Sequence, residues 1–253
     1  MTAPFDVGAE PIAGTETHSY YRDRPASELS PLLRSGAGFT MFWHAVGFEG
    51  EMPFAAFADR LPADMRQVSP KRITEYLAGR YCAERALAAA GAEAGCWLPR
   101  GSDRLPIWPP EWIGSISHAD GIAAAAVVAR GPGTALGLDV ERWINADQAG
   151  QICRLIASQA ELELLVALSP ERALTLLFSA KEALFKALYP STRRFMEFSA
   201  ARLVDANDKE LSLQLSEHWS PDWVRGTVVP VRFLLQEAYV SAAALARRTP
   251  VER

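Results

Sequence analysis

The stretch LGLDVERW, residues 136–143, decides the fold prediction because apolar and other side chains alternate along it. Alternation with a period of two predicts a β-strand with one apolar face. Because successive side chains of a strand point to opposite faces, Asp139 and Glu141 share the other face. Two neighbouring carboxylates need a favourable environment there, and the sequence leaves two options open, exposure to water or a bound cation.

Amphipathic segments before and after this strand predict helices. Residues 69–91 begin with a serine and a proline that suit a helix start. Residues 148–169 are also helical in pattern, with a break expected near Ser158. Residues 170–190 have apolar side chains at helical spacing, and Pro190 is expected to end that helix.

Strand-like runs accompany the long helices, at residues 122–129 in the first half and within residues 195–246 in the second. The segment ARGPGTA, residues 129–135, separates the halves because its glycines and proline interrupt regular structure. We therefore predict an α+β fold of two similar half-domains, residues 1–132 and 133–253. Each is expected to be a small antiparallel sheet packed on a long helix, with the functional site in the cleft between them.

Composition narrows the class of protein. The 253 residues are 49% hydrophobic and 22% charged, as in globular proteins, and the net charge of −4 argues against general nucleic-acid binding. The longest small apolar run, 122–129, is too short to cross a membrane, and residues 1–14 lack a secretory-signal pattern. Cys82, Cys96 and Cys153 form no CxxC pair, so we expect reduced thiols in a cytoplasmic protein.

Three carboxylates could act together. Acids on a strand face are usually solvated, and a Glu–Lys pair on a helix is usually exposed, so each motif alone has an ordinary explanation. Together, Asp139, Glu141 and Glu182 supply the hard oxygen ligands that Mg²⁺ prefers, with substrate phosphates completing the shell. Lys186 follows Glu182 by four residues on the same helix face, and Lys181 lies beside them. The lysines would then lie where phosphate charge accumulates.

A polar turn adds donors to this set. Ser117 and His118, with Arg80 nearby, could bind a polyphosphate, although a lone turn histidine usually bonds to backbone. Such an assembly suits attack on a pyrophosphate, since a cation and lysines stabilise the transferring and leaving oxygens and a carboxylate takes the proton. The chain lacks the G-x-x-x-x-G-K-[ST] motif, which argues against an ordinary P-loop nucleotidase.

The motifs GSISHADG (114–121), LGLDVE (136–141) and FSAKEALFK (178–186), in this order, resemble the 4′-phosphopantetheinyl transferases. The length is similar to that of the surfactin-type, pseudo-dimeric group, and residues 71–87 and 104–118 resemble its enterobactin synthase component D branch. The resemblance implies holo-acyl-carrier-protein synthase activity. In that reaction the 4′-phosphopantetheine group of coenzyme A moves to a serine hydroxyl of an apo acyl or peptidyl carrier protein, leaving adenosine 3′,5′-bisphosphate. Siderophore, non-ribosomal peptide, polyketide and fatty-acid biosynthesis are the pathways that it suggests.

The resemblance also implies catalytic and metal-binding roles. Asp139, Glu141 and Glu182 match the acids that hold Mg²⁺, with Mn²⁺ as an alternative. Glu182 matches the base for the carrier serine, acting directly or through water. Lys186 matches the lysine that stabilises charge on the phosphates and contacts coenzyme A.

Further positions match residues that bind coenzyme A in the family. Lys181 corresponds to a lysine near the phosphates, and Ser117 and His118 correspond to a pair at the 3′-phosphate and pyrophosphate. Arg80 and Arg104 fall where basic residues bind the adenosine end. These five residues therefore complete the expected coenzyme A site.

Other positions have two interpretations. Glu161 matches an acidic position near the active site of some members, or is an ordinary helix-surface glutamate. Trp143, Ile144 and Leu155 are candidates for carrier docking, with core packing as the alternative for each. Phe178 stands where many members have tryptophan and is expected to pack in the core.

Two competing functions stay open at this point. A catalytically inactive coenzyme A or nucleotide-binding partner protein would keep the pocket and lose transfer. A Mg²⁺-dependent phosphodiester or pyrophosphate hydrolase would act without a carrier. We expect a monomer, since one chain already supplies two halves, and no membrane or nucleic-acid partner.

Overall fold

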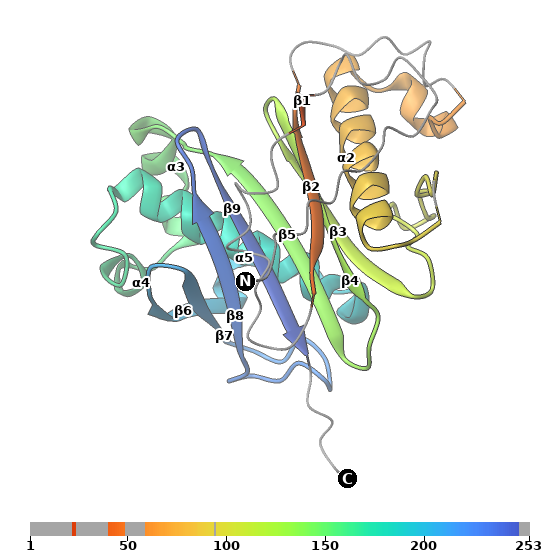
Figure 1. Cartoon of the computed structure of the whole chain (residues 1–253). Coiled ribbons are helices and arrows are strands. Elements are labelled where there is room, and N and C mark those ends of the chain that lie inside the picture. The colour runs from red at the N-terminus through yellow and green to blue at the C-terminus, as the bar shows by residue number, and fades with distance from the viewer. Residues whose placement is uncertain (1–21, 24–39, 49–58, 94, 248–253) are drawn as a thin grey trace, which may run out of the picture.

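The structure, a computed structural model, describes residues 22–23, 40–48, 59–93 and 95–247. It contains two antiparallel sheets with helices, which confirms the α+β prediction (Figure 1). The first sheet has the strand order β1-β2-β4-β3: β1 (Arg22–Asp23), β2 (Phe42–Gly47), β4 (Ile122–Ala129) and β3 (Trp112–Ala119). The second has the order β5-β9-β8-β7-β6: β5 (Thr134–Arg142), β9 (Tyr239–Arg247), β8 (Val228–Leu235), β7 (Glu210–Leu215) and β6 (Ala201–Ala206).

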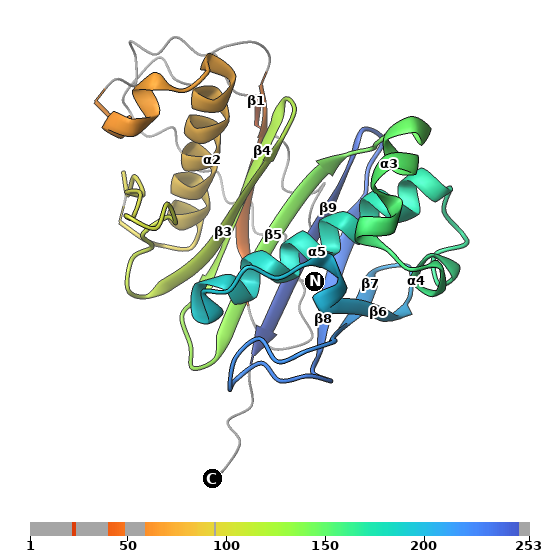
Figure 2. The ribbon, with the colours of Figure 1, turned by 180° about the vertical axis from the view of Figure 1, so that it is seen from behind.

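One long helix covers each sheet. Helix α2 (Pro70–Ala89) packs on the first sheet, and α5 (Pro170–Thr192) crosses β5 and β9 of the second (Figure 2). Shorter elements flank them: α3 (Ala146–Ile156), α4 (Gln159–Glu163), and the 3₁₀ turns η4 (Ala63–Gln67) and η5 (Phe198–Ala200). None of the helices in the described part of the chain is long and apolar enough to span a membrane.

Strand β4 shows how the halves are joined. It lacks alternation because both of its faces are buried: Ala123, Ala125 and Val127 join the core under α2, whereas Ala124 and Ala126 meet the second sheet. After β4, the chain turns at residues 130–133 and enters β5, where the sequence places the break between halves. The exact bounds of the predicted half-domains remain a prediction, and residues 1–21 and 248–253, with the leader region considered above, lie outside the described residues.

The helix ends test the local sequence signals. Ser69 Oγ accepts the Arg72 N–H at the start of α2, and the segment 148–169 is indeed divided, between α3 and α4. The prediction that Pro190 ends α5 is wrong, since the helix continues to Thr192. A proline this near the C-terminus removes only one internal hydrogen bond, and the helix ends at the left-handed Arg193 instead.

Helix α5 packs over the polar face of β5. A Cβ on Gly137 would lie 1.9 Å from the Ala183 carbonyl oxygen, so only glycine allows this approach of helix and strand. Asp139, two residues further, is 2% exposed beneath the same helix. The close packing therefore places side chains of α5 directly against the carboxylates of β5.

Candidate active site

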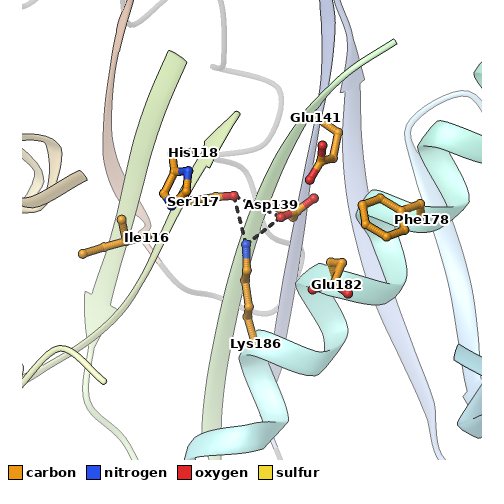
Figure 3. Close-up of a pocket in the computed structure, with 8 residues that line it drawn as sticks. All are labelled: Ile116, Ser117, His118, Asp139, Glu141, Phe178, Glu182 and Lys186. Carbon is orange, nitrogen blue, oxygen red and sulfur yellow. Dashed lines mark hydrogen bonds and ion pairs between the residues drawn. The ribbon is translucent and has the colours of Figure 1, made fainter. Parts of the chain in front are cut away.

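A pocket of about 320 Å³ lies where β3, β5 and α5 meet, and so draws on both halves (Figure 3). Its lining is a set of eight residues: Ile116, Ser117 and His118 from β3, Asp139 and Glu141 from β5, and Phe178, Glu182 and Lys186 from α5. All three predicted carboxylates, one predicted lysine and the Ser–His pair are therefore brought together at one site.

Asp139 is the centre of a hydrogen-bonded group in this pocket. Its Oδ1 accepts from Ser117 Oγ at 3.0 Å and from Lys186 Nζ at 2.6 Å. Lys186 Nζ also lies 2.9 Å from Ser117 Oγ, so three elements meet at one ammonium (Figure 3). Asp139 Oδ2 is buried and has no hydrogen-bond partner among the described residues, which is unfavourable for a carboxylate unless another ligand reaches it.

The other two carboxyl groups, Glu141 and Glu182, have raised pKa values. Burial, and then the charge of Asp139, raise the pKa of Glu141 to about 8. The same two causes raise the pKa of Glu182 above its usual range, with Lys186 opposing them. Like charges held close together in a protected pocket favour either protonation or a bound cation.

These residues fit a hard divalent cation. Within the described residues, no three Asp, Glu, His or Cys side chains already converge as a complete metal-binding group. Asp139, Glu141 and Glu182 nevertheless offer oxygen donors around one pocket, and the buried Asp139 Oδ2 accepts no hydrogen bond from the described residues. An incomplete carboxylate set is what a Mg²⁺ ion shared with substrate phosphates requires.

Two residues of α2 that the sequence did not suggest orient His118. Arg72 Nη1 lies 2.9 Å from His118 Nε2, and Glu75 Oε2 lies 3.6 Å from Nδ1. Arginine can only donate, so Nε2 accepts and the ring proton is on Nδ1, facing Glu75. Burial lowers the pKa of His118 even though Glu75 opposes the shift. The sequence signal for this pair was its spacing, since residues three apart on a helix lie on the same face.

The remaining basic candidates lie elsewhere. Neither Arg80 nor Arg104 is among the described residues that line the pocket. Arg80 is buried in α2, where its Nε donates to the Tyr76 hydroxyl and its guanidinium stacks 4.8 Å from that ring. Arg104 is exposed in the loop before β3 with a left-handed φ of 67°.

Lys181 is not among the described residues that line the pocket, and its place near the phosphates stays a prediction. Its side chain is buried on another side of α5, with Nζ 2.8 Å from Glu161 Oε1. Adjacent positions on a helix point about 100° apart, so Lys181 and Glu182 face different surroundings. Glu161 is 6% exposed, so its interpretation as a helix-surface residue is wrong.

The three docking candidates differ in exposure. Trp143 Nε1 donates to the Gln236 carbonyl, and Ile144 packs against the small core between α3 and α5. Leu155, in contrast, is 71% exposed on α3. Phe178 packs beside Phe198 and also forms one wall of the pocket.

Comparison with known proteins identifies the family of the chain. A model for the 4′-phosphopantetheinyl transferase N-terminal domain matches residues 61–128, and one for the 4′-phosphopantetheinyl transferase superfamily matches residues 135–244. Enterobactin synthase component D of Salmonella typhi is 31% identical over 191 residues, which cover 75% of this chain and 79% of the relative. The chain belongs to the 4′-phosphopantetheinyl transferase superfamily.

Other members of the superfamily match shorter segments. The 4′-phosphopantetheinyl transferase Svp of Streptomyces mobaraensis is 33% identical over 164 residues, 63% of this chain and 65% of the relative. Enterobactin synthase component D of Escherichia coli strain K12 is 42% identical over 127 residues, 49% of this chain and 59% of the relative. In both relatives the matched part is less than two thirds of their length. The resemblance to the superfamily and to its component D branch is confirmed, and the two family models meet at the turn between β4 and β5.

Proposed function

We propose that this chain transfers the 4′-phosphopantetheine group of coenzyme A to a serine of an apo acyl or peptidyl carrier protein. The observation that carries the proposal is the Asp139–Lys186–Ser117 group, in a pocket shared by both halves and lined by Glu141 and Glu182. An ammonium and hydroxyl beside clustered carboxylates suit a pyrophosphate ligand and an attacking hydroxyl.

The reaction needs one bond formed and one broken. The serine Oγ bonds to the phosphorus next to pantetheine, its proton goes to Glu182, and adenosine 3′,5′-bisphosphate leaves with the bridging oxygen. Asp139, Glu141 and Glu182 would hold Mg²⁺ or Mn²⁺, which when bound stabilises negative charge on the pyrophosphate. Lys186 donates to the phosphate oxygens, and Ser117 holds that ammonium on the pocket side of β3.

The coenzyme A site is assigned from the basic edge of the pocket. His118, oriented by Arg72 and Glu75, is proposed to bind phosphate together with Ser117. The exposed Arg104 is kept as a candidate for the adenosine end. Arg80 is left out of the contact set because Tyr76 engages its guanidinium, and Lys181 is left out because it pairs with Glu161.

The cellular setting follows from the same proposal. Apo acyl and peptidyl carriers are the proposed partners, and siderophore assembly is the favoured pathway since relatives named enterobactin synthase component D recur among the matches. A cytoplasmic monomer is proposed because one chain supplies every side of the pocket and its three cysteines are free thiols.

Intact-mass spectrometry of an apo carrier incubated with coenzyme A, Mg²⁺ and this protein tests the proposal. A gain of one phosphopantetheine mass is expected with the wild type and not with Glu182→Ala. Coenzyme A bound without any gain would indicate an inactive binding protein. Coenzyme A consumed while the carrier stays unchanged would indicate a hydrolase.

A further inference from the structure

A buried ion pair lies beside the pocket without facing it. Glu161 of α4 and Lys181 of α5 are 6% and 5% exposed, and the Nζ–Oε1 distance is 2.8 Å. Lys181 directly precedes Glu182 in the chain, yet it turns toward α4. A buried charge pair is costly to desolvate, so its value depends on the further hydrogen bonds that both groups make.

Those hydrogen bonds connect four elements. Lys181 Nζ donates to the Ile156 carbonyl at the end of α3, at 2.7 Å. Glu161 Oε2 accepts from the backbone N–H and the hydroxyl of Ser158, both at 2.8 Å, at the start of α4. Glu161 Oε1 accepts from Leu203 N–H of β6 at 2.9 Å. The pair therefore fixes the junction of α3 and α4 against α5 and the second sheet.

The electrostatics agree with a structural use of both charges. Burial would raise the pKa of Glu161, but the hydrogen bonds from Lys181, Ser158 and Leu203 outweigh it and hold that pKa below its usual range. Burial lowers the pKa of Lys181, and Glu161 opposes the shift. The Glu161 carboxylate is therefore stabilised by several hydrogen bonds, and Lys181 supplies its counter-charge.

The junction supports the wall of the pocket. Ile152, Cys153 and Ile156 of α3 belong to the small core in which Phe178 is packed, and the Phe178 ring lines the pocket. In Figure 3 Phe178 and Glu141 form one side of the site, while His118 and Ile116 form the other, with Lys186 and Asp139 between them.

The two sides differ in their side chains. One side holds His118 with Arg72 and Glu75 behind it, and its hydrogen-bonding groups suit the phosphates of coenzyme A. The other side holds the Phe178 ring next to Glu141, and two neighbouring segments expose apolar side chains, Leu155 of α3 and Val166 after α4. A protein acceptor has more to gain from that apolar surface than a nucleotide does.

We infer that Glu161 and Lys181 are positioning residues, which hold α3 and α4 at the acceptor side of the pocket, and that Lys181 is not a phosphate ligand. The inference rests on the proposed transferase function. Loss of the pair frees the α3–α4 junction to move, together with the α3 side chains that pack against Phe178. It leaves the Ser117–Asp139–Lys186 group in place, because that group shares no hydrogen bond with the pair.

Two measurements separate the roles: calorimetric affinity for coenzyme A, and steady-state KM and kcat for the apo carrier. The variants are Lys181→Met, the double variant Glu161→Gln with Lys181→Met, and Lys186→Gln as the control within the pocket. The double variant leaves no buried charge unpaired, and its amide still accepts from Ser158 or Leu203, so it carries the comparison if Lys181→Met does not fold.

We expect the coenzyme A Kd of the Lys181 variants to stay within about twofold of wild type, while Lys186→Gln raises it roughly tenfold or more. Carrier KM should rise about tenfold with a smaller change in kcat, the loss expected when an interface surface is misplaced.

A coenzyme A Kd that rises as much as in Lys186→Gln would identify Lys181 as a phosphate ligand and overturn the inference. An unchanged carrier KM in a folded double variant would also overturn it, leaving the pair as ordinary structural support. A wild-type protein that binds no coenzyme A or loads no carrier overturns the proposed function itself, which keeps the two failures distinct.

Discussion

Lys186 Nζ lies 2.6 Å from Asp139 Oδ1, and this contact joins α5 to β5 at the centre of the pocket. Asp139 is almost fully buried, whereas the Lys186 side chain is partly exposed toward the pocket. One ammonium can therefore neutralise the buried carboxylate and still present a donor to an incoming phosphate. Under the proposed function, this contact allows a pocket lined by carboxylates to bind an anionic ligand.

Replacing Lys186 tests this dual role. In Lys186→Gln a donor remains but its charge is lost, and a charge-assisted hydrogen bond is worth about 1.5–3 kcal/mol. We expect coenzyme A to bind roughly 10- to 150-fold more weakly, as measured by calorimetry. Lys209→Gln, in the exposed turn between β6 and β7, is the matched control and should bind like wild type. Equal affinities for both variants would contradict a phosphate contact from Lys186.

Glu141 predicts a pH dependence. Its pKa of about 8, against 4.5 for the ordinary group, means that the folded protein at pH 7 holds a proton which the unfolded chain has released. That proton's contribution to stability is complete below pH 4.5 and is lost as the pH rises through 8. A cation must displace the proton, so Mg²⁺ affinity should increase as the pH rises toward 8 and beyond.

Mg²⁺ titration at pH 7 in two buffers of different ionisation enthalpy measures the released proton. The observed heat should differ between buffers for the wild type, and the difference should shrink in Glu141→Gln, which has no proton to release. Identical heats in both buffers for the wild type would show that Glu141 is already ionised before the metal binds.

The exposed apolar residues predict which surface the carrier uses. Leu155 on α3 is 71% exposed, and burying a leucine contributes about 1.5–3 kcal/mol. Leu155→Glu should therefore raise carrier KM roughly 10- to 150-fold, because the apolar contact is lost and an acidic carrier is also repelled. Coenzyme A affinity should not change. Phe195→Glu is the control, since Phe195 is 85% exposed and follows the C-terminal end of α5. A carrier KM that rises in Phe195→Glu and not in Leu155→Glu would place the docking surface at Phe195.

The pocket was predictable where local periodicity decides which side chains share a face. A period of two placed Asp139 and Glu141 together, and a spacing of four placed Glu182 with Lys186. The distance between strand and helix could not be obtained in this way. It depends on Gly137, whose missing side chain matters only once α5 is packed above it.

Lys181 and Arg80 show the limit of sequence reasoning. Both are cations in or near the right motifs, but their side chains are engaged by Glu161 and Tyr76. Lys181 and Glu161 are twenty residues apart and on different helices, so no helical periodicity relates them. Arg72 was overlooked for the same reason, since its partner His118 belongs to another element and lies 46 residues away.

Substitution of Gly137 tests whether close packing of α5 on β5 creates the site. In Gly137→Ala the new methyl group would meet the backbone of Ala183 and Ala187 at 1.9 and 2.5 Å, contacts that no rotamer change can relieve. Overpacking of this kind costs about 1–3 kcal/mol or more, so urea denaturation should show that loss in the free energy of unfolding.

Any folded fraction of Gly137→Ala should also bind coenzyme A more weakly, because α5 must move away and carry Lys186 from Asp139. Gly150→Ala is the matched control: its Cβ meets nothing within 4 Å among the described residues, and it lies inside α3. Replacing a helical glycine by alanine should stabilise the protein by about 0.5–1 kcal/mol and leave binding unchanged. If Gly137→Ala were as stable as this control, the strand and helix would have room to spare, and the pocket would not depend on their close approach.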